Sequence, residues 1–276
     1  NLLYQNLKVE KTVSAAFYRN GVLEEVKAAR RALRFVEWDD VYKADFYDSA
    51  ALLLQAMMDQ SLRYAALAEE KAAGEGDPVR ARELREIAQI CRNIPAKPAR
   101  TFREAIQSFF FYWCYALCGT MPGARFDQFM YPYYKADLEA GRITREEALE
   151  LIECLRLKIM QYGLVGGGKE QREKWAGMAR WHNFILGGCD REGKDITNEI
   201  SYLMLEAAKE TMTPHPTMSI RVSQQTPPEF MRKAMDLVRT GIGMPAFISE
   251  SSYISFLRKY NVPLEDARDF AIAGCL

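Results

Sequence analysis

The first third of the chain has the hydrophobic pattern of helices. From Leu23 to Arg92, apolar residues recur at steps of three and four among Ala, Leu, Glu, Arg and Lys. The run is interrupted at Gly74–Pro78, where Asp77 followed by Pro78 is typical of a helix start. The pattern predicts two antiparallel helices with a mixed-charge face exposed to solvent.

Capping signals predict two further helices. Thr101 and Glu104 have the spacing of a capping box, ahead of a strongly apolar segment that should form a buried helix to about Leu117. Thr144 and Glu147 have the same spacing and should open a helix to about Tyr162.

After three glycines at 166–168, short apolar runs alternate with helical segments. Strands are predicted at Asn183–Leu186, Met218–Val222, Pro245–Ile248 and Phe270–Ile272. Helices are predicted at Thr197–Ala208, from a cap at Thr226–Glu229 to about Thr240, and at Tyr253–Tyr260, followed by an acidic turn at Pro263–Asp266. This alternation indicates an α/β layer architecture or barrel.

Composition narrows the class of protein. Hydrophobic residues make up 49% and charged residues 27%, which excludes a largely disordered chain. Acidic and basic residues are matched at 37 each, so bulk charge favours neither a nucleic acid nor an anionic membrane as partner. The most apolar stretch, Ala105–Cys118, is too short and too interrupted to span a bilayer, and no targeting peptide is visible. We expect a soluble, cytoplasmic protein.

The spacing of the cysteines does not match that of a disulfide-bonded domain. The six are scattered without disulfide spacing, which favours a reducing compartment. Cys114 and Cys118 lie on one helical face without two further zinc ligands nearby, so we predict no metal site. The glycines at 166–168 lack the Lys-Ser/Thr of a phosphate loop, so nucleotide binding is not expected.

Cys275 is the strongest candidate for a catalytic residue. It follows Gly274 at the end of an apolar run, where a cysteine is most often a small buried hydrophobe. Conventional nucleophilic chemistry would need an activating base, and neither His182 nor His215 stands in a recognised context for that role.

Several polar residues each have a structural and a functional interpretation. Arg221 lies inside a predicted strand and needs an anionic partner, either a protein carboxylate or the acid group of a substrate. Arg125 and Asp127 could form an ion pair that fixes a turn, or contact a ligand. His215, between two prolines, could sit in a rigid turn with a partly exposed imidazole, or act as a proton donor at a cavity rim.

The residues at the start of the predicted helix Thr197–Ala208 also have a structural and a functional interpretation. Thr197 and Asn198 are suited to cap the helix, whereas Ser201, one turn later, could reach a cavity.

An ordered series of motifs accompanies Gly274-Cys275. In chain order they are Pro98–Ala105, Arg125–Gln128 with Tyr131–Tyr134, Leu186–Gly188 with Asp195–Glu199, Pro214–Thr217 running to Arg221, and Gly243–Phe247. This series resembles, in the same order, the glycyl radical enzymes, the family of pyruvate formate-lyase. The family's usual glutamate two positions after the cysteine, and its C-terminal glycine loop, would lie beyond Leu276.

The resemblance implies a fold. The family has a ten-stranded α/β barrel wrapped in helices, with the active cysteine on a loop tip inside. Residues 1–276 are then expected to be a single partial catalytic domain, because the sequence stops one residue after Cys275. Residues 1–95 would be mainly outer helices, and residues 96–276 would be helices plus the first barrel strands up to the cysteine loop. The predicted strands alone could not close a barrel, so we expect this segment by itself to be inactive and poorly stable.

The resemblance also implies a reaction. Cys275 would form a thiyl radical that removes a hydrogen atom from a small polar or carboxylated substrate. Pyruvate formate-lyase itself uses two adjacent cysteines, and position 274 here is glycine. The pattern is therefore closer to the single-cysteine relatives, which eliminate water, amine, sulfite or carbon dioxide, or add a hydrocarbon to fumarate. The alternatives are a formate C-acetyltransferase proper, an arylsuccinate-synthase-like addition to fumarate and, from another class, a non-catalytic helical interaction protein.

Cofactor, partners and substrate contacts follow from the same resemblance. No organic cofactor would be bound; a glycyl radical in the C-terminal part would be installed by an iron–sulfur activating enzyme that uses S-adenosylmethionine. The complete protein would be a homodimer in an anaerobic cell. The residues predicted to bind substrate are Arg221, His215, Ser201, Thr197, Asn198, Arg125 and Asp127.

Overall fold

The computed structural model describes residues 22–115, 122–161 and 183–272 of the chain. The described residues form two compact units, one within residues 11–115 and the other from residue 122 onward. The expectation of a single partial catalytic domain stays a prediction.

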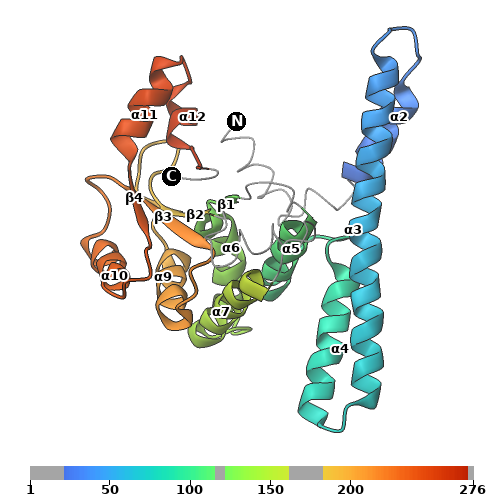
Figure 1. The fold of residues 1–276 in the computed structure, drawn as a ribbon, viewed down its shortest axis with the longest axis horizontal. Coiled ribbons are helices and arrows are strands. Elements are labelled where there is room, and N and C mark those ends of the chain that lie inside the picture. The colour runs from blue at the N-terminus through green and yellow to red at the C-terminus, as the bar shows by residue number, and fades with distance from the viewer. Residues whose placement is uncertain (1–21, 116–121, 162–182, 273–276) are drawn as a thin grey trace, which may run out of the picture. The chain divides into compact units, whose positions relative to one another are not determined.

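The first unit is entirely helical in its described residues. Its helices are α2 (Val22–Ala32), α3 (Asp40–Gly74), α4 (Pro78–Asn93) and α5 (Phe102–Tyr115) (Figure 1). The predicted antiparallel pair is confirmed as α3 and α4, which lie side by side (Figure 1). Asp77 caps α4 as predicted, because its Oδ1 accepts a hydrogen bond from the backbone N–H of Val79 at 2.9 Å.

One of the two predicted capping boxes is complete. On α7 (Arg145–Gln161), Thr144 Oγ1 accepts from the backbone N–H of Glu147, and Glu147 Oε2 accepts from that of Thr144. On α5, Thr101 Oγ1 accepts from the N–H of Glu104, but the Glu104 carboxylate accepts from the N–H and guanidinium of Arg100. That second box is only half formed, since a nearby cation competes for the carboxylate.

The second unit is built on a four-stranded parallel sheet. Its strands lie in the order β1 (Pro122–Ala124), β2 (Asn183–Gly187), β3 (Thr217–Val222) and β4 (Ala246–Ser249) (Figure 1). The strands predicted near residues 183, 218 and 245 are confirmed to within a residue or two, and β1 was not predicted. Every residue of β2 is buried, as expected for a parallel strand covered on both faces.

Helices alternate with these strands. They are α6 (Phe126–Glu139), α7, α9 (Glu199–Thr211), α10 (Pro228–Val238), α11 (Glu250–Lys259) and the short α12 (Leu264–Arg268). Helix α9 packs against α6, α7 and α10. Helix α6 was not predicted, because it contains Pro132, which normally argues against a helix interior.

Three local predictions are wrong. The acidic turn expected at Pro263–Asp266 is instead the start of helix α12. Phe270–Ile272 is buried but is not a strand; the carbonyl of Phe270 accepts a hydrogen bond from the Arg221 side chain at 3.1 Å, where a strand would bond to a neighbouring backbone. Thr226 does not cap α10. Its Oγ1 accepts from the backbone N–H of Ser223, and the residue preceding α10 is Pro227, which has no side-chain acceptor.

Among the helices described, none has the length and apolar character needed to cross a membrane.

Strand β2 runs into a turn that requires glycine. Gly188 has a φ of +87°, and a Cβ added there would lie 2.6 Å from Arg221 Nε and 2.7 Å from Glu250 Oε1. These distances are far inside van der Waals contact. The backbone therefore passes directly over a buried charged pair, which only glycine allows.

We expect Gly188→Ala to lower the free energy of unfolding by roughly 3–5 kcal/mol, the range seen when a buried ion pair is broken. Gly141 offers a matched control, because its φ is +64° and nothing lies within 4 Å of its added Cβ. Gly141→Ala should cost only about 1 kcal/mol. Denaturant unfolding of the wild type and both variants measures the loss in the free energy of unfolding. Equal losses in the two variants would contradict the steric explanation.

Candidate active site

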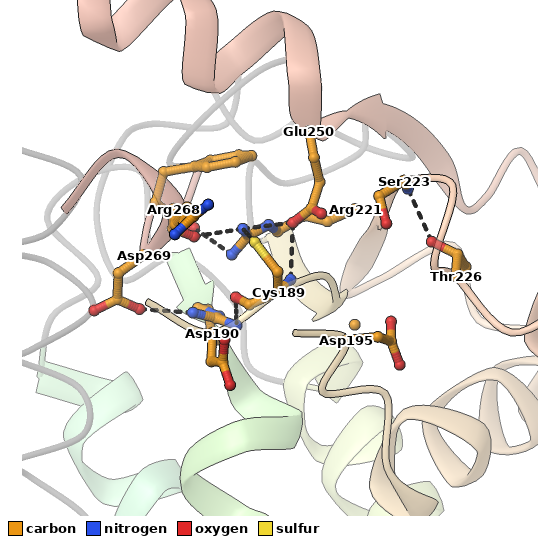
Figure 2. A network of polar contacts seen from close by, with 12 residues as sticks. Cys189, Asp190, Asp195, Arg221, Ser223, Thr226, Glu250, Arg268 and Asp269 are labelled. Atoms are coloured by element: carbon orange, nitrogen blue, oxygen red, sulfur yellow. Dashed lines mark hydrogen bonds and ion pairs between the residues drawn. The ribbon is translucent and has the colours of Figure 1, made fainter. Parts of the chain in front are cut away.

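The parallel strands bring polar residues together at their carboxyl ends. Arg125 follows β1, Cys189 lies just beyond β2, Arg221 is near the end of β3, and Glu250 follows β4. Because the carboxyl ends of parallel strands meet at one edge of a sheet, residues far apart in the sequence become neighbours there. Figure 2 shows the resulting network of polar contacts.

Arg221 is the most deeply buried member of this network, with no exposed surface. Its Nη2 forms an ion pair with Glu250 Oε1 at 2.6 Å (Figure 2). Its Nη1 and Nη2 donate to the backbone carbonyls of Phe270 at 3.1 Å and Arg268 at 2.5 Å. Burial lowers the pKa of the Arg221 guanidinium to about 10, so the group stays charged at neutral pH. A protein carboxylate thus supplies the anionic partner that a buried arginine needs.

Arg125 is buried and forms the second ion pair of the network, with the partly exposed Asp269. Its Nη1 lies 2.6 Å from Asp269 Oδ1, and its Nη2 donates to the carbonyl of Cys189 at 3.0 Å. The backbone N–H of Cys189 donates in turn to Glu250 Oε1 at 2.9 Å. The peptide groups of Cys189 therefore link the two ion pairs to each other.

The Cys189 thiol is held in this network as a neutral group. It is 6% exposed, and its Sγ lies 3.7 Å from Arg221 Nη2. Burial, reinforced by the charge of Glu250, raises the pKa of the thiol. The sulfur is thus protonated at neutral pH and is a weak nucleophile.

Asp127, Asn198 and Ser201 form a separate cluster at the end of β2, in which Asp127 and Ser201 have no exposed surface. Asp127 Oδ2 accepts hydrogen bonds from the N–H of Gly187 at 2.7 Å and from Ser201 Oγ at 2.5 Å. Burial raises the pKa of the Asp127 carboxyl, and the bonds from Ser201 and Gly187 oppose that shift. The other oxygen, Oδ1, is buried without a hydrogen-bond partner among the described residues.

Asn198 and Ser201 also form the capping box of α9. Asn198 Oδ1 accepts from the N–H groups of Ile200 and Ser201, while Ser201 Oγ accepts from the N–H of Asn198. Asn198 Nδ2 donates to the carbonyl of Asp127. The cap of α9 is therefore tied to the first turn of α6.

Two other predicted site residues, Thr197 and His215, lie within the described part of the chain. Thr197 bonds locally, through its N–H and Oγ1, to the carboxylate of Asp195. His215 precedes β3, at the opposite end of that strand from Arg221, and is 4% exposed. The partly exposed imidazole expected for His215 is wrong, because the turn is packed into the interior. Cys275 and His182 lie outside the described residues.

Sequence reasoning missed Glu250 and Asp269, and it considered Cys189 only as a second thiol near Cys275, not as one of the site residues. A signal was present for Cys189, since Gly188-Cys189 after a buried strand repeats the pattern that singled out Gly274-Cys275. Glu250 is the first charged residue after an apolar strand, a weaker signal. Asp269 meets Arg125 across 144 positions, and nothing local in the sequence indicates that pairing.

One cluster in the described residues has the geometry to hold a cation. It consists of Glu37, Asp39 and Asp40 at the start of α3, in the helical unit. The ammonium of Lys43 lies within 3.4 Å of all three carboxylates and already offsets part of their charge.

Comparisons with known proteins give a consistent answer. A family model described as pyruvate formate lyase-like matches residues 18–276. The isethionate sulfite-lyase of Nitratidesulfovibrio vulgaris is 32% identical over 247 residues, covering 86% of this chain and 29% of the relative. The chain thus spans about a third of the length of the curated relatives it matches.

Solved structures agree with the sequence match. A structure concerning 1,2-propanediol dehydration in Roseburia inulinivorans is 34% identical, with a TM-score of 0.90 over 98% of this chain and 34% of that one. The B12-independent glycerol dehydratase from Clostridium butyricum is 36% identical, with a TM-score of 0.88 over 97% of this chain and 34% of that one. The predicted fold class, a helix-rich part of an α/β barrel, is confirmed. The chain belongs to the pyruvate formate lyase-like family of glycyl radical enzymes.

Proposed function

We propose that the complete protein cleaves a C–heteroatom or C–C bond in a small polar or carboxylated substrate, using a thiyl radical on Cys275. The observation that carries this proposal is the similarity to lyases and dehydratases over most of the chain, together with a family match over residues 18–276 that includes Gly274-Cys275. The named relatives act on isethionate and glycerol, both small polar molecules.

The chemistry required of Cys275 is hydrogen-atom transfer. The glycyl radical of the complete protein would supply the unpaired electron. The S–H bond of Cys275 would break, with its hydrogen passing to that radical centre, and the sulfur would then take a hydrogen atom from a substrate C–H bond. The resulting carbon radical weakens the bond to the adjacent leaving group.

The described residues that lead to Cys275 suit this chemistry. Phe270, Ala271 and Ile272 are at most 4% exposed, so the chain approaches Cys275 through a water-excluded region. Exclusion of water prevents side reactions of reactive intermediates. On this mechanism, histidine is not needed as a base.

Acetyl transfer is the less favoured alternative. It needs a second thiol beside the first, and Gly274 has no side chain. Cys189 is a poor substitute, because its thiol is buried against Arg221 and burial raises its pKa. Addition of a hydrocarbon to fumarate remains a further alternative, but the relatives that match this chain in sequence favour elimination.

Substrate contacts and partners are part of the proposal. His215, Ser201, Thr197, Asn198 and Asp127 stay predicted substrate contacts. We also expect an iron–sulfur activating enzyme that uses S-adenosylmethionine, a homodimeric complete protein and a cytoplasmic, anaerobic setting, all on the family resemblance.

Cys275→Ser in the complete protein should abolish turnover of isethionate or glycerol while the activating enzyme still generates the glycyl radical. An O–H bond is too strong to exchange a hydrogen atom with carbon at small cost, whereas an S–H bond is not. Electron paramagnetic resonance measures the radical, and product analysis measures turnover.

Cys154→Ser is the matched control, because Cys154 is an exposed thiol on α7. It should keep wild-type activity. Turnover that survives in Cys275→Ser would remove Cys275 from the mechanism, and failure of the wild-type protein to form any radical would favour the non-catalytic interaction protein.

Activated complete protein should not exchange labelled formate into pyruvate in the presence of coenzyme A. The reason is the missing second thiol at position 274. Label appearing in pyruvate would contradict this prediction and would favour a formate C-acetyltransferase.

A further inference from the structure

Two buried arginines hold three consecutive residues of the segment that leads to Cys275. Arg221 donates to the carbonyls of Arg268 at 2.5 Å and Phe270 at 3.1 Å. Arg125 binds the carboxylate of the intervening residue, Asp269, at 2.6 Å. The described chain continues to Ile272, and Cys275 follows Ala273 and Gly274.

These contacts close into a ring through the strand ends (Figure 2). Asp269 binds Arg125, Arg125 binds the carbonyl of Cys189, and the N–H of Cys189 binds Glu250. Glu250 binds Arg221, and Arg221 donates hydrogen bonds to the backbone carbonyls of the residues on either side of Asp269. Segment 268–270 is thus tied to residues at the ends of β1, β2, β3 and β4.

The formal charges of the ring cancel. Arg125 and Arg221 contribute two positive charges, and Glu250 and Asp269 two negative charges. Arg221 has no exposed surface and the Arg125 side chain only 5%. To bind Arg221, a substrate carboxylate would have to displace the buried carboxylate of Glu250, and separating a buried pair is strongly unfavourable. Asp269, the partner of Arg125, is only partly buried, and Arg191 lies 3.7 Å from its other oxygen.

Packing fixes the same segment a second time. The Phe270 ring stacks on Tyr253, with centroids 4.9 Å apart and planes 9° from parallel. The Arg221 guanidinium lies 4.1 Å from the centroid of the same ring, within the range of a cation–π contact. Phe270 and Ile272 also belong to one buried cluster with Ile185 and Ile248.

We propose that Arg125 and Arg221 are positioning residues for Cys275, acting through the backbone of residues 268–270 rather than by binding substrate. The proposal rests on the proposed role of Cys275 in hydrogen-atom transfer. Atom transfer requires the sulfur to stand close to its partner atoms, and a displacement of about 1 Å is enough to cost on the order of 100-fold in rate.

The first test needs neither activation nor substrate. The rate at which iodoacetamide alkylates Cys275 is measured by peptide mass spectrometry in the complete, unactivated protein. In Arg221→Lys and Arg125→Lys the charge is retained and the forked hydrogen bonds are lost. We expect alkylation to be at least about tenfold faster in both, because the loss of fixed hydrogen bonds favours local opening.

Arg156→Lys is the matched control. Arg156 is also a buried arginine, 1% exposed, but it donates to the carbonyls of Thr213 and Pro216, at the amino end of β3. It should lose thermal stability as Arg221→Lys does, while its Cys275 alkylation rate stays near that of the wild type. Asp269→Asn is a milder variant should either arginine substitution fail to fold, and it should shift the rate in the same direction.

The second test separates positioning from substrate binding in the activated protein, with isethionate or glycerol as substrate. Positioning predicts kcat lower by about 100-fold with KM nearly unchanged and normal glycyl radical content. A substrate-binding role predicts a raised KM with kcat retained.

The proposal is overturned if alkylation of Cys275 is equal in the wild type, Arg221→Lys and Arg156→Lys, or if KM alone changes. Failure of the proposed function has a different signature. In that case Cys275→Ser would keep its activity, whatever the alkylation rates of the arginine variants.

Discussion

The buried ion pair between Arg221 and Glu250 is the interaction on which the sheet edge depends. Removing both charges from water is expensive, and their attraction compensates only when the remaining hydrogen-bonding groups are satisfied. Here Glu250 Oε1 accepts from Cys189 N–H, and the two terminal nitrogens of Arg221 donate to carbonyls of segment 268–270, whereas its buried Nε has no hydrogen-bond partner among the described residues. The pair is therefore favourable only when β2, β3, β4 and the segment after α12 are all in place, which couples these elements to one another.

The parallel sheet and Gly188 make this pair possible. Parallel strands place their carboxyl ends at one edge, so that Arg221 on β3 and Glu250 after β4 become neighbours. The chain leaving β2 must then pass over the pair, and Gly188 allows this because it has no Cβ and adopts a positive φ. Asp127, hydrogen-bonded to Gly187 and Ser201, fixes the same turn to α6 and α9.

Local signals predicted the elements but not the contacts between them. Periodicity and capping residues located three of the four strands and most helices, because these features depend on neighbours in sequence. Helix α6 was not predicted because it contains Pro132. The buried residues Phe270–Ile272 were predicted as a strand, but burial alone does not specify a hydrogen-bonding partner. The need of Arg221 for an anion could be predicted from its strand context. Its partner Glu250, and the pairing of Arg125 with Asp269, depend on strand order and so could not.

A ring whose formal charges balance suits a site whose chemistry moves hydrogen atoms. Acid–base sites rely on unbalanced charge to shift a pKa, whereas a hydrogen atom carries no net charge and its transfer responds mainly to distance. In the ring, the charges of Arg125 and Arg221 are matched by those of Asp269 and Glu250, and the Cys189 thiol stays protonated. Such an arrangement contributes rigidity without a strong net field. The two arginines therefore make more physical sense as supports of the backbone before Cys275 than as receptors for an anionic substrate.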